Sequence, residues 1–202
     1  MFRSRKELEL FVESIPTFKK PKLHLEQYPT DAALVATAVW DAHMRGLLHT
    51  VLDLGCGTGR FAISAAATGA TYVLCVDIDP EALLLAKRAA ERFGLEAVDF
   101  LTAHVARLYV RRRFSVVFQN PPFGIWGERG VDISFLKAAV THGEVVYTIH
   151  KLATLDHIKR TVERWGLRLE VVERSTLAIK PMYRHHRKRI HRVEVFLAVV
   201  KT

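Results

Sequence analysis

The sequence predicts an α/β fold in which a mainly parallel sheet of seven strands carries helices on both faces. From residue 50 onward, short apolar runs alternate with helical patterns, and such alternation is typical of parallel strands joined by helices. The final two apolar runs follow each other with no helical pattern between them. They are therefore expected to form an antiparallel hairpin at the edge of the sheet.

Each element is predicted from its own stretch of sequence. The strands are expected at 50–54, 71–77, 97–102, 114–119, 144–150, 168–176 and 192–200. The accompanying helices are expected to begin near 59, to span 80–93, and to lie near 132–141 and 154–165. Asp79 is expected to cap the helix that begins at Pro80, because proline suits the first helical position.

A different pattern precedes the sheet. Residues 3–14 have apolar side chains on one helical face, which predicts a short amphipathic helix. Residues 16–29 contain three prolines and are expected to be extended. Thr30 is then expected to cap the next helix, with Asp31 in its first turn near the positive end of the helix dipole.

Composition limits the classes of partner. The chain has 202 residues and is expected to form one domain over 1–202. Its 30 Lys and Arg exceed its 21 Asp and Glu, giving a net charge of +9, which favours a polyanion such as nucleic acid. No apolar run is long enough to span a bilayer and no secretory segment is present, so a cytoplasmic protein is expected. Cys56 and Cys75 lack metal-ligand spacing, so free thiols and no metal site are expected.

A glycine-rich turn follows the first strand, in the sequence DLGCGTGR. Gly55, Gly57 and Gly59 allow the backbone to turn sharply and a ligand to approach closely. Asp53 stands two residues before the first glycine, and Asp77 ends the second strand. In a sheet of this kind, an acidic residue at the end of the second strand faces the ribose of a nucleotide bound over the first turn.

Two ligand classes fit a turn of this type. Nicotinamide dinucleotides normally use GxGxxG, whereas this turn has GxGxG with Arg60 where the third glycine would fall. S-adenosylmethionine carries cationic sulfonium and amino groups, which the Asp53 carboxylate would favour, while the same carboxylate would disfavour a pyrophosphate. The methyl donor is the preferred interpretation, and a dinucleotide is the alternative.

The fourth strand runs directly into QNPPFG at 119–124. Prolines end regular strand pairing and hold the preceding residue extended, so this stretch predicts a rigid corner. Such a corner can aim the side chain of Asn120. By itself, a turn of this kind is also common as a structural connection.

The segments DLGCGTG, VDID and NPPF together resemble the class I S-adenosylmethionine-dependent methyltransferases that act on planar amino nitrogens. With PKLHLEQYPT at 21–30, the GxDxxFLK pattern at 130–137 and YTIHK at 147–151, the chain is similar over nearly its whole length to one family. This is the methyltransferase-like family that makes N6-methyladenosine in small-subunit ribosomal RNA. The resemblance implies a Rossmann-like class I methyltransferase fold, with residues 1–45 closing over the cofactor site.

The resemblance also implies where S-adenosylmethionine binds. The implied contacts are Gln27, Thr30, Asp53, Gly55, Gly57, Thr58, Gly59, Arg60, Asp77, His104 and Val105. For Gln27 and Thr30, capping of a helix is the alternative role. The family usually has an acidic residue at the end of the third strand, where it reaches the adenine amino group of the donor. Here His104 is expected to substitute by accepting at one ring nitrogen, and an exposed loop histidine is the alternative.

The same resemblance gives the corner a catalytic role. The implied catalytic residues are Asn120, Pro121, Pro122 and Phe123. The side-chain oxygen of Asn120 and the backbone oxygen of Pro121 can each accept one N–H of the target amine, which favours a pyramidal nitrogen with a free lone pair. Phe123 would stack on the base, and Trp126 is a second stacking candidate. A base inside a duplex is unreachable, so the target must be single-stranded or flipped out.

Basic stretches predict contacts with the RNA backbone. The residues concerned are Arg111, Arg112, Arg113, Arg184, Arg187, Lys188 and Arg189. A solvated charged face is the alternative. Eukaryotic members of the family work with a small zinc-binding activator subunit, so the resemblance implies such a partner as well.

Alternative functions remain open at the level of sequence. The NPP corner also serves enzymes that methylate DNA adenine, the N2 amino group of guanine in ribosomal RNA, or a glutamine of release factors. A non-catalytic RNA-binding factor in ribosome assembly is the remaining alternative.

Overall fold

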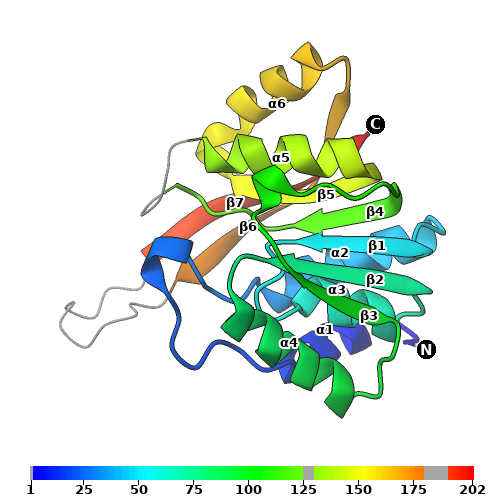
Figure 1. Ribbon diagram of the computed structural model, residues 1–202. Coiled ribbons are helices and arrows are strands. Elements are labelled where there is room, and N and C mark those ends of the chain that lie inside the picture. Colours follow the sequence, from blue (N-terminus) through cyan, green and yellow to red (C-terminus); the bar gives the residue numbers. More distant parts are fainter. Residues whose placement is uncertain (1, 125–129, 180–190) are drawn as a thin grey trace.

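The computed structural model describes residues 2–124, 130–179 and 191–202. Its centre is a seven-stranded sheet with the strand order β3-β2-β1-β4-β5-β7-β6 (Figure 1). The strands are β1 (Thr50–Leu54), β2 (Tyr72–Asp77), β3 (Val98–Thr102), β4 (Phe114–Gln119), β5 (Gly143–Lys151), β6 (Arg168–Ile179) and β7 (His191–Lys201). Strands β1 to β5 pair in parallel, and β7 pairs antiparallel with both β5 and β6. The expected parallel sheet with an antiparallel hairpin at its edge is therefore confirmed.

Helices cover both faces of this sheet (Figure 1). The helices are α1 (Arg5–Ser14), α2 (Ala32–Met44), α3 (Arg60–Ala67), α4 (Pro80–Arg92), α5 (Val131–His142) and α6 (Leu155–Arg164). Three short 3₁₀ turns join them, namely η1 (Leu23–Leu25), η2 (Val105–Arg107) and η3 (Leu152–Thr154). Strand β1 leads through the glycine turn into α3, and β2 leads directly into α4. The carboxyl ends of the parallel strands therefore meet these helix starts at one edge of the sheet.

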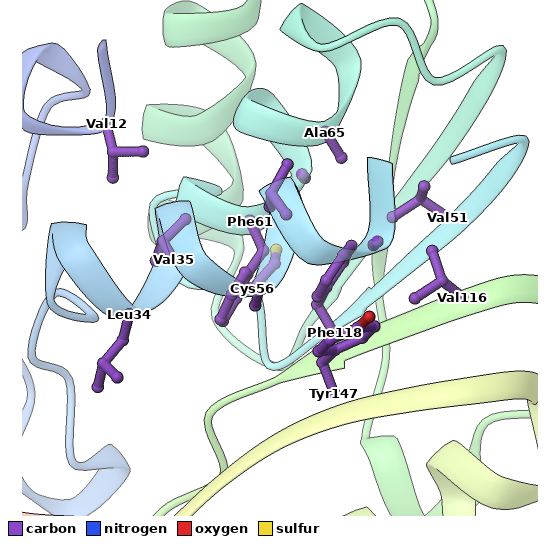
Figure 2. Packing of buried hydrophobic residues seen from close by; sticks show 14 of the residues in the cluster. Val12, Leu34, Val35, Val51, Cys56, Phe61, Ala65, Val116, Phe118 and Tyr147 are labelled. Carbon is purple, nitrogen blue, oxygen red and sulfur yellow. The ribbon is translucent and has the colours of Figure 1, made fainter. Parts of the chain in front are cut away.

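Helices α2 and α3 bury their apolar sides against one face of the sheet, and α1 packs on α2 and α3. At the centre of this layer, the ring of Phe61 on α3 stacks on Phe118 of β4, with 5.2 Å between ring centroids. Phe118 in turn contacts Tyr147 of β5 at a centroid distance of 5.3 Å. Figure 2 shows these aromatic side chains between the helices and the strands. This packing fixes the start of α3, and with it the glycine turn, over the end of β1.

Helices α5 and α6 cover the opposite face. Leu136 of α5 and Ile158 and Val162 of α6 are fully buried there, with Phe114 and Val117 of β4 in the same cluster. The apolar surface of both helices is thus used against the sheet. Within the described ranges, no helix combines the length and the hydropathy that crossing a membrane requires.

The cap of α2 differs from the expectation. Asp31, not Thr30, is the capping residue, because its carboxylate accepts the backbone N–H of Ala33 at 3.0 Å and of Leu34 at 3.2 Å. The first backbone N–H groups of a helix have no partner within the helix, and a carboxylate can accept two of them. The Thr30 hydroxyl instead accepts a hydrogen bond from Asn120. For α4 the expectation holds, since Asp79 accepts the N–H of Glu81 at 3.1 Å.

Candidate active site

A cavity of about 530 Å³ opens at the carboxyl edge of the parallel strands. Four parts of the described chain form its walls: the N-terminal segment around η1, the glycine turn after β1, the connections that follow β2, β3 and β4, and the start of α5. Eleven of the residues expected from the sequence line it. They are Gln27, Thr30, Gly55, Gly57, Thr58, Arg60, Asp77, His104, Val105, Asn120 and Pro122. The cofactor and catalytic segments therefore meet in one place.

The glycine turn needs glycine for two reasons. Gly55 and Gly57 have φ angles of +67° and +55°, a region that other residues rarely adopt. In addition, a Cβ atom on Gly55 would lie 2.8 Å from the ring of Phe135, and one on Gly57 would lie 2.8 Å from the ring of Phe18. Two aromatic rings thus pack directly on the backbone of this turn. The sequence patterns did not indicate either ring.

Asp77 holds the shape of the turn from the end of β2. One carboxylate oxygen accepts the N–H of Gly57 at 2.8 Å, and the other accepts the N–H of Asp79 at 2.9 Å. Burial raises the pKa of Asp77 above its ordinary value, and these backbone hydrogen bonds act in the opposite direction. The same side chain lines the cavity. Asp77 therefore both holds the glycine turn in shape and faces the space that a ligand would occupy.

Asp53 occupies a different position. Its side chain is 1% exposed and accepts the N–H of Ala62 at 2.9 Å, so it supports the first turn of α3. It is not among the residues that line the cavity. Burial raises the pKa of Asp53 to about 8. The sequence pattern suggested a charged group beside the donor, whereas the structure has a buried acid beneath the turn.

Replacing Asp53 by asparagine is expected to stabilise the protein at neutral and alkaline pH. The unfolded state releases the Asp53 proton near pH 4 but the folded state near pH 8, so wild-type stability is full below pH 4 and falls as the pH rises towards 8. Asparagine keeps an acceptor for Ala62 and does not titrate. The gain in unfolding free energy should reach on the order of 2 to 4 kcal/mol at pH 8.

Denaturant unfolding of both proteins at pH 5, 6, 7 and 8 measures this gain. Asp156→Asn, which changes an exposed carboxylate on α6, is the control and should show no comparable trend. A constant difference between Asp53→Asn and wild type across this range would contradict the burial argument.

The N-terminal segment is fastened to the start of α4. Gln27 donates from Nε2 to Asp79 Oδ2 at 2.6 Å and accepts the backbone N–H of Lys22 at 2.9 Å. Lys22 also forms an ion pair with Asp79, with 2.9 Å between Nζ and Oδ1. Both ends of the Gln27 amide are thus used inside the protein. Lys22, which the sequence patterns did not single out, completes this attachment.

The corner after β4 contains a side-chain amide, that of Asn120. Asn120 donates from Nδ2 to the Thr30 hydroxyl at 3.1 Å. Its other amide atom, Oδ1, is buried and has no hydrogen-bond partner within the described part of the chain. Buried acceptors are normally paired. An orphaned carbonyl oxygen on a residue that lines a cavity indicates a site for a ligand N–H group.

Phe123 lies differently from the expectation. It is 6% exposed, does not line the cavity, and packs against Tyr28 with 5.6 Å between ring centroids. Stacking of Phe123 on a base therefore requires another position of this ring. Tyr28 and Phe135 do line the cavity, and they are aromatic surfaces that the sequence patterns did not indicate.

His104 also lines the cavity, but its hydrogen bonding changes the expected role. Its Nδ1 accepts the N–H of Ala106 at 3.2 Å. In the neutral ring the proton is then on Nε2, which makes that nitrogen a donor. His104 therefore cannot take over the acceptor role of a carboxylate through Nε2. Val105, which follows it, is buried in the same wall.

A buried polar row supports the corner from below. Gln119 donates from Nε2 to Thr148 Oγ1 at 3.0 Å, and Thr148 contacts Nε2 of His150 at 2.8 Å. Nδ1 of His150 lies 3.8 Å from a carboxylate oxygen of Asp132 in the first turn of α5. Burial lowers the pKa of His150, so the ring is neutral at physiological pH. The GxDxxFLK pattern at 130–137 and the YTIHK pattern at 147–151 thus meet in one contact.

The expected RNA-binding arginines divide into two groups. Arg113 donates to the Gly143 carbonyl and to Thr202, and the Arg112 guanidinium lies 5.4 Å from the ring centroid of Tyr72. With Arg111 they precede β4, at the end of the strand opposite Asn120, so they lie at the far edge of the sheet from the cavity. The second group lies outside the described residues, as does Trp126. This group comprises Arg184, Arg187, Lys188 and Arg189.

The cysteines and possible metal ligands each had an expectation from the sequence. Cys56 and Cys75 are free and buried, as their spacing predicted. Across residues 2–124, 130–179 and 191–202, no group of His, Cys, Asp and Glu side chains has an arrangement that could hold a metal ion.

Sequence comparison identifies relatives of nearly the same length. The chain is 32% identical to the rRNA N(6)-adenosine-methyltransferase METTL5 of Danio rerio over 198 residues, covering 94% of this chain and 95% of the relative. It belongs to the METTL5 family of methyltransferases. A general methyltransferase-domain family also matches residues 51–131. The archaeal protein MJ0284 of Methanocaldococcus jannaschii is likewise 32% identical, over 96% of this chain and 92% of the relative.

Structural comparison agrees with this membership. The crystal structure of PH1948 from Pyrococcus horikoshii, named as a candidate RNA methyltransferase, superposes with a TM-score of 0.86 at 30% identity. The alignment covers 100% of this chain and 99% of that one. A Thermoplasma acidophilum protein, 1320, superposes with a TM-score of 0.72 at 25% identity over 98% and 97% of the two chains. The class I methyltransferase fold expected from the sequence is confirmed.

This METTL5-family protein is an S-adenosylmethionine-dependent methyltransferase. The residues present fit the methyl donor. The cavity of about 530 Å³ falls within the range of roughly 300 to 1,000 Å³ that small-molecule sites occupy. The glycine turn lets a ligand approach the backbone, and Asp77 stands at the end of β2, where a ribose would be held. The donor is thus expected between the turn, Asp77 and the N-terminal segment.

Proposed function

We propose that this enzyme methylates the exocyclic N6 amino group of an adenosine in small-subunit ribosomal RNA. Its METTL5 relatives carry the name of rRNA N6-adenosine methyltransferases, which supports RNA adenine as the acceptor. The net charge of +9 is consistent with a polyanionic substrate. The small subunit follows from the sequence resemblance described above.

One observation carries the choice of a planar amine as the acceptor. Asn120 Oδ1 is buried without a partner in the described structure, on a residue of the cavity wall. The amide nitrogen of Asn120 is held by Thr30, so the oxygen is the amide atom left without a partner in the described structure. An acceptor in this position suits an N–H donor such as an exocyclic amino group.

The corner has a clear chemical task. An amino nitrogen conjugated with a purine ring is planar and a weak nucleophile. Asn120 Oδ1 and the backbone oxygen of Pro121 would each accept one N–H, which favours a pyramidal nitrogen whose lone pair points away from the corner. Pro121 has no N–H and a fixed φ, so it presents only an acceptor. These residues bind and orient the amine, and no general base is needed for the attack.

The donor, when bound, supplies a methyl group already activated on a positively charged sulfur. The chain's own contribution is then to hold the amine in line, and positioning of this kind can remove a large share of an activation barrier. Tyr28 and Phe135 offer aromatic faces to a base that enters the cavity. Because the amino group of a paired adenine is inaccessible inside a duplex, the target nucleotide must be unpaired or flipped out.

Methyl transfer to purified ribosomal RNA tests the proposal. Donor binding is first measured by calorimetry, and tritiated methyl transfer is then followed on separated small-subunit and large-subunit RNA. We expect label in small-subunit RNA alone, recovered as N6-methyladenosine after digestion to nucleosides. Label in N2-methylguanosine, in large-subunit RNA or in a protein would contradict it. Donor binding with no transfer to any of these would favour a non-catalytic role.

The zinc-binding activator subunit stays a prediction of the resemblance. To test it, the rate of methyl transfer by the purified chain alone is compared with the rate after a small zinc-binding subunit is added. An increase on addition of such a subunit would support the partner.

A further inference from the structure

The segment Glu26–Thr30 has the sequence EQYPT. It lies against both halves of the candidate active site, namely the donor side at the glycine turn and the corner at 120–124. It follows η1 in the N-terminal segment, which passes beside the ends of the central strands in Figure 1. All five of its residues line the cavity. The sequence resemblance assigns Gln27 and Thr30 to donor binding only. The contacts of this segment with the corner at 120–124 indicate an additional role.

Thr30 contacts both halves through two different oxygens. Its backbone carbonyl accepts a hydrogen bond from Arg60 Nη1 at 2.6 Å, and Arg60 is the first residue of α3, directly after the glycine turn. Its side-chain hydroxyl accepts a hydrogen bond from Asn120 Nδ2 at 3.1 Å. One residue therefore joins the donor side of the cavity to the corner 90 positions later in the chain.

The hydroxyl contact holds the side-chain amide of Asn120 in place beside the cavity. An amide side chain has a donor end and an acceptor end of nearly the same shape. Thr30 holds the nitrogen, and this leaves Oδ1 as the buried atom without a partner in the described structure. If the amide turned over, its NH₂ group would face the N–H groups of the target amine, and the two sets of donors would repel.

Glu26 fixes the backbone of the same corner. It is 7% exposed, has a left-handed φ of 50°, and accepts the backbone N–H of Phe123 at 2.5 Å. Tyr28 adds a ring contact with Phe123 at 5.6 Å between centroids. A buried carboxylate bound to a backbone N–H is a strong, directional contact. Glu26, Tyr28 and Thr30 thus hold the corner at three points.

We propose that the EQYPT segment positions the catalytic corner, with Thr30 holding the side chain of Asn120 in place and Glu26 fixing the backbone at Phe123. Thr30 and Glu26 are positioning residues in this arrangement. The inference rests on the proposed function for its catalytic consequence, but the orientation of Asn120 can be observed independently of the acceptor. Because the segment also contacts Arg60 and Asp79, it connects the donor pocket with the corner.

Three variants of the full chain separate positioning from simple structural support. Thr30→Val removes the hydroxyl with little change in shape, and Thr30→Ser keeps the hydroxyl. Thr37→Val is the matched control, since the Thr37 hydroxyl, in the middle of α2, also makes side-chain hydrogen bonds, with Arg5 of α1 and Glu173 of β6. For each protein, donor affinity is measured by calorimetry, and kcat and KM are measured with small-subunit RNA.

The expected result is a fall in kcat in Thr30→Val with little change in donor affinity. A buried donor left without its partner costs enough to correspond to a loss of about 10- to 100-fold. The backbone carbonyl that binds Arg60 is unaffected by the substitution, so donor affinity should stay within about threefold of wild type. Thr30→Ser should recover most of the activity, and Thr37→Val should match wild type.

A second measurement does not depend on turnover. Nuclear magnetic resonance of the Asn120 side-chain NH₂ group reports its hydrogen bond directly. The chain contains one asparagine, so labelling of asparagine alone gives a single NH₂ signal. We expect this signal to shift in Thr30→Val and to stay near its wild-type position in Thr30→Ser. Glu26→Ala should likewise increase the hydrogen-exchange rate of the Phe123 backbone amide.

The outcomes distinguish the two proposals. If wild type transfers no methyl group to RNA adenine but the Asn120 signal shifts as expected, the positioning inference holds and the proposed function fails. If wild type methylates adenine and Thr30→Val has wild-type kcat and an unshifted Asn120 signal, the positioning inference is overturned. A parallel loss of donor affinity and kcat in Thr30→Val, with no change in the Asn120 signal, would also overturn it by making Thr30 a donor contact alone.

Discussion

Replacing Asn120 by alanine is expected to remove nearly all methyl transfer while leaving donor binding close to wild type. The lost side chain provides the buried acceptor oxygen of the corner, and its nitrogen contacts Thr30, not the glycine turn. Loss of one directed hydrogen-bonding group in an active site typically lowers kcat by about 10²- to 10³-fold. The expected defect is thus in the chemical step.

Single-turnover methyl transfer and donor calorimetry on the same preparation measure this prediction. Thr141→Ala is a suitable control on α5, because the Thr141 hydroxyl is exposed and donates to the Lys137 carbonyl in its own helix. Thr141→Ala should behave as wild type in both measurements. Turnover by Asn120→Ala within a few-fold of wild type would contradict the assigned role of the corner.

Replacing Asp77 by asparagine is expected to weaken donor binding by about 100-fold, although the two side chains have the same shape. Both carboxylate oxygens of Asp77 accept backbone N–H groups, from Gly57 and from Asp79. Asparagine has one oxygen, so its NH₂ group would face one of these N–H groups. A buried donor that faces another donor costs about 1 to 3 kcal/mol, and the glycine turn would shift away from its binding geometry.

Calorimetry with S-adenosylmethionine and with S-adenosylhomocysteine tests the Asp77 prediction. Asp53→Asn is the matched comparison, because Asp53 has one backbone partner, Ala62, and an asparagine can keep it. Both ligands should bind much more weakly to Asp77→Asn and nearly normally to Asp53→Asn. Equal losses in the two variants would mean that the pairing of Asp77 with the turn does not decide donor affinity.

The strands could be predicted closely because buried parallel strands leave a plain signal in the sequence. Residues 50–54 and 114–119 were expected as strands and are β1 and β4 with the same bounds. Each is a short, largely apolar run, and both faces of the sheet are covered, so most side chains in them must be apolar. The glycine turn and Asp77 were predictable for a similar reason, since their spacing is set by one local turn.

Contacts between distant segments could not be predicted in this way. Nothing local indicates that Thr30 meets Asn120, because the pairing depends on how the N-terminal segment crosses the sheet. The capping of α2 by Asp31 was missed since Thr and Asp are both good capping residues, and the choice depends on the hydroxyl being used elsewhere. The role expected for His104 changed for the same reason, as its Nδ1 is committed to a neighbouring backbone N–H.

The position of Arg111–Arg113 was available from topology. These residues come before a parallel strand whose far end carries Asn120, so a sheet of this type must place them at the opposite edge. The charge pattern alone does not contain this geometric constraint. Their contacts with Gly143, Thr202 and Tyr72 show that part of this basic run is used within the fold.

The buried polar row beneath the corner also determines which molecule loses conformational entropy on binding. The row consists of Gln119, Thr148, His150 and Asp132. It ties the last residue of β4 to β5 and to the start of α5, so the residue preceding Asn120 has little freedom to lose when a substrate arrives. The entropy of ordering must then come chiefly from the nucleic acid, whose target nucleotide has to leave its stacked neighbours. Loosely structured RNA segments should consequently be modified faster than the same sequence closed in a stable helix.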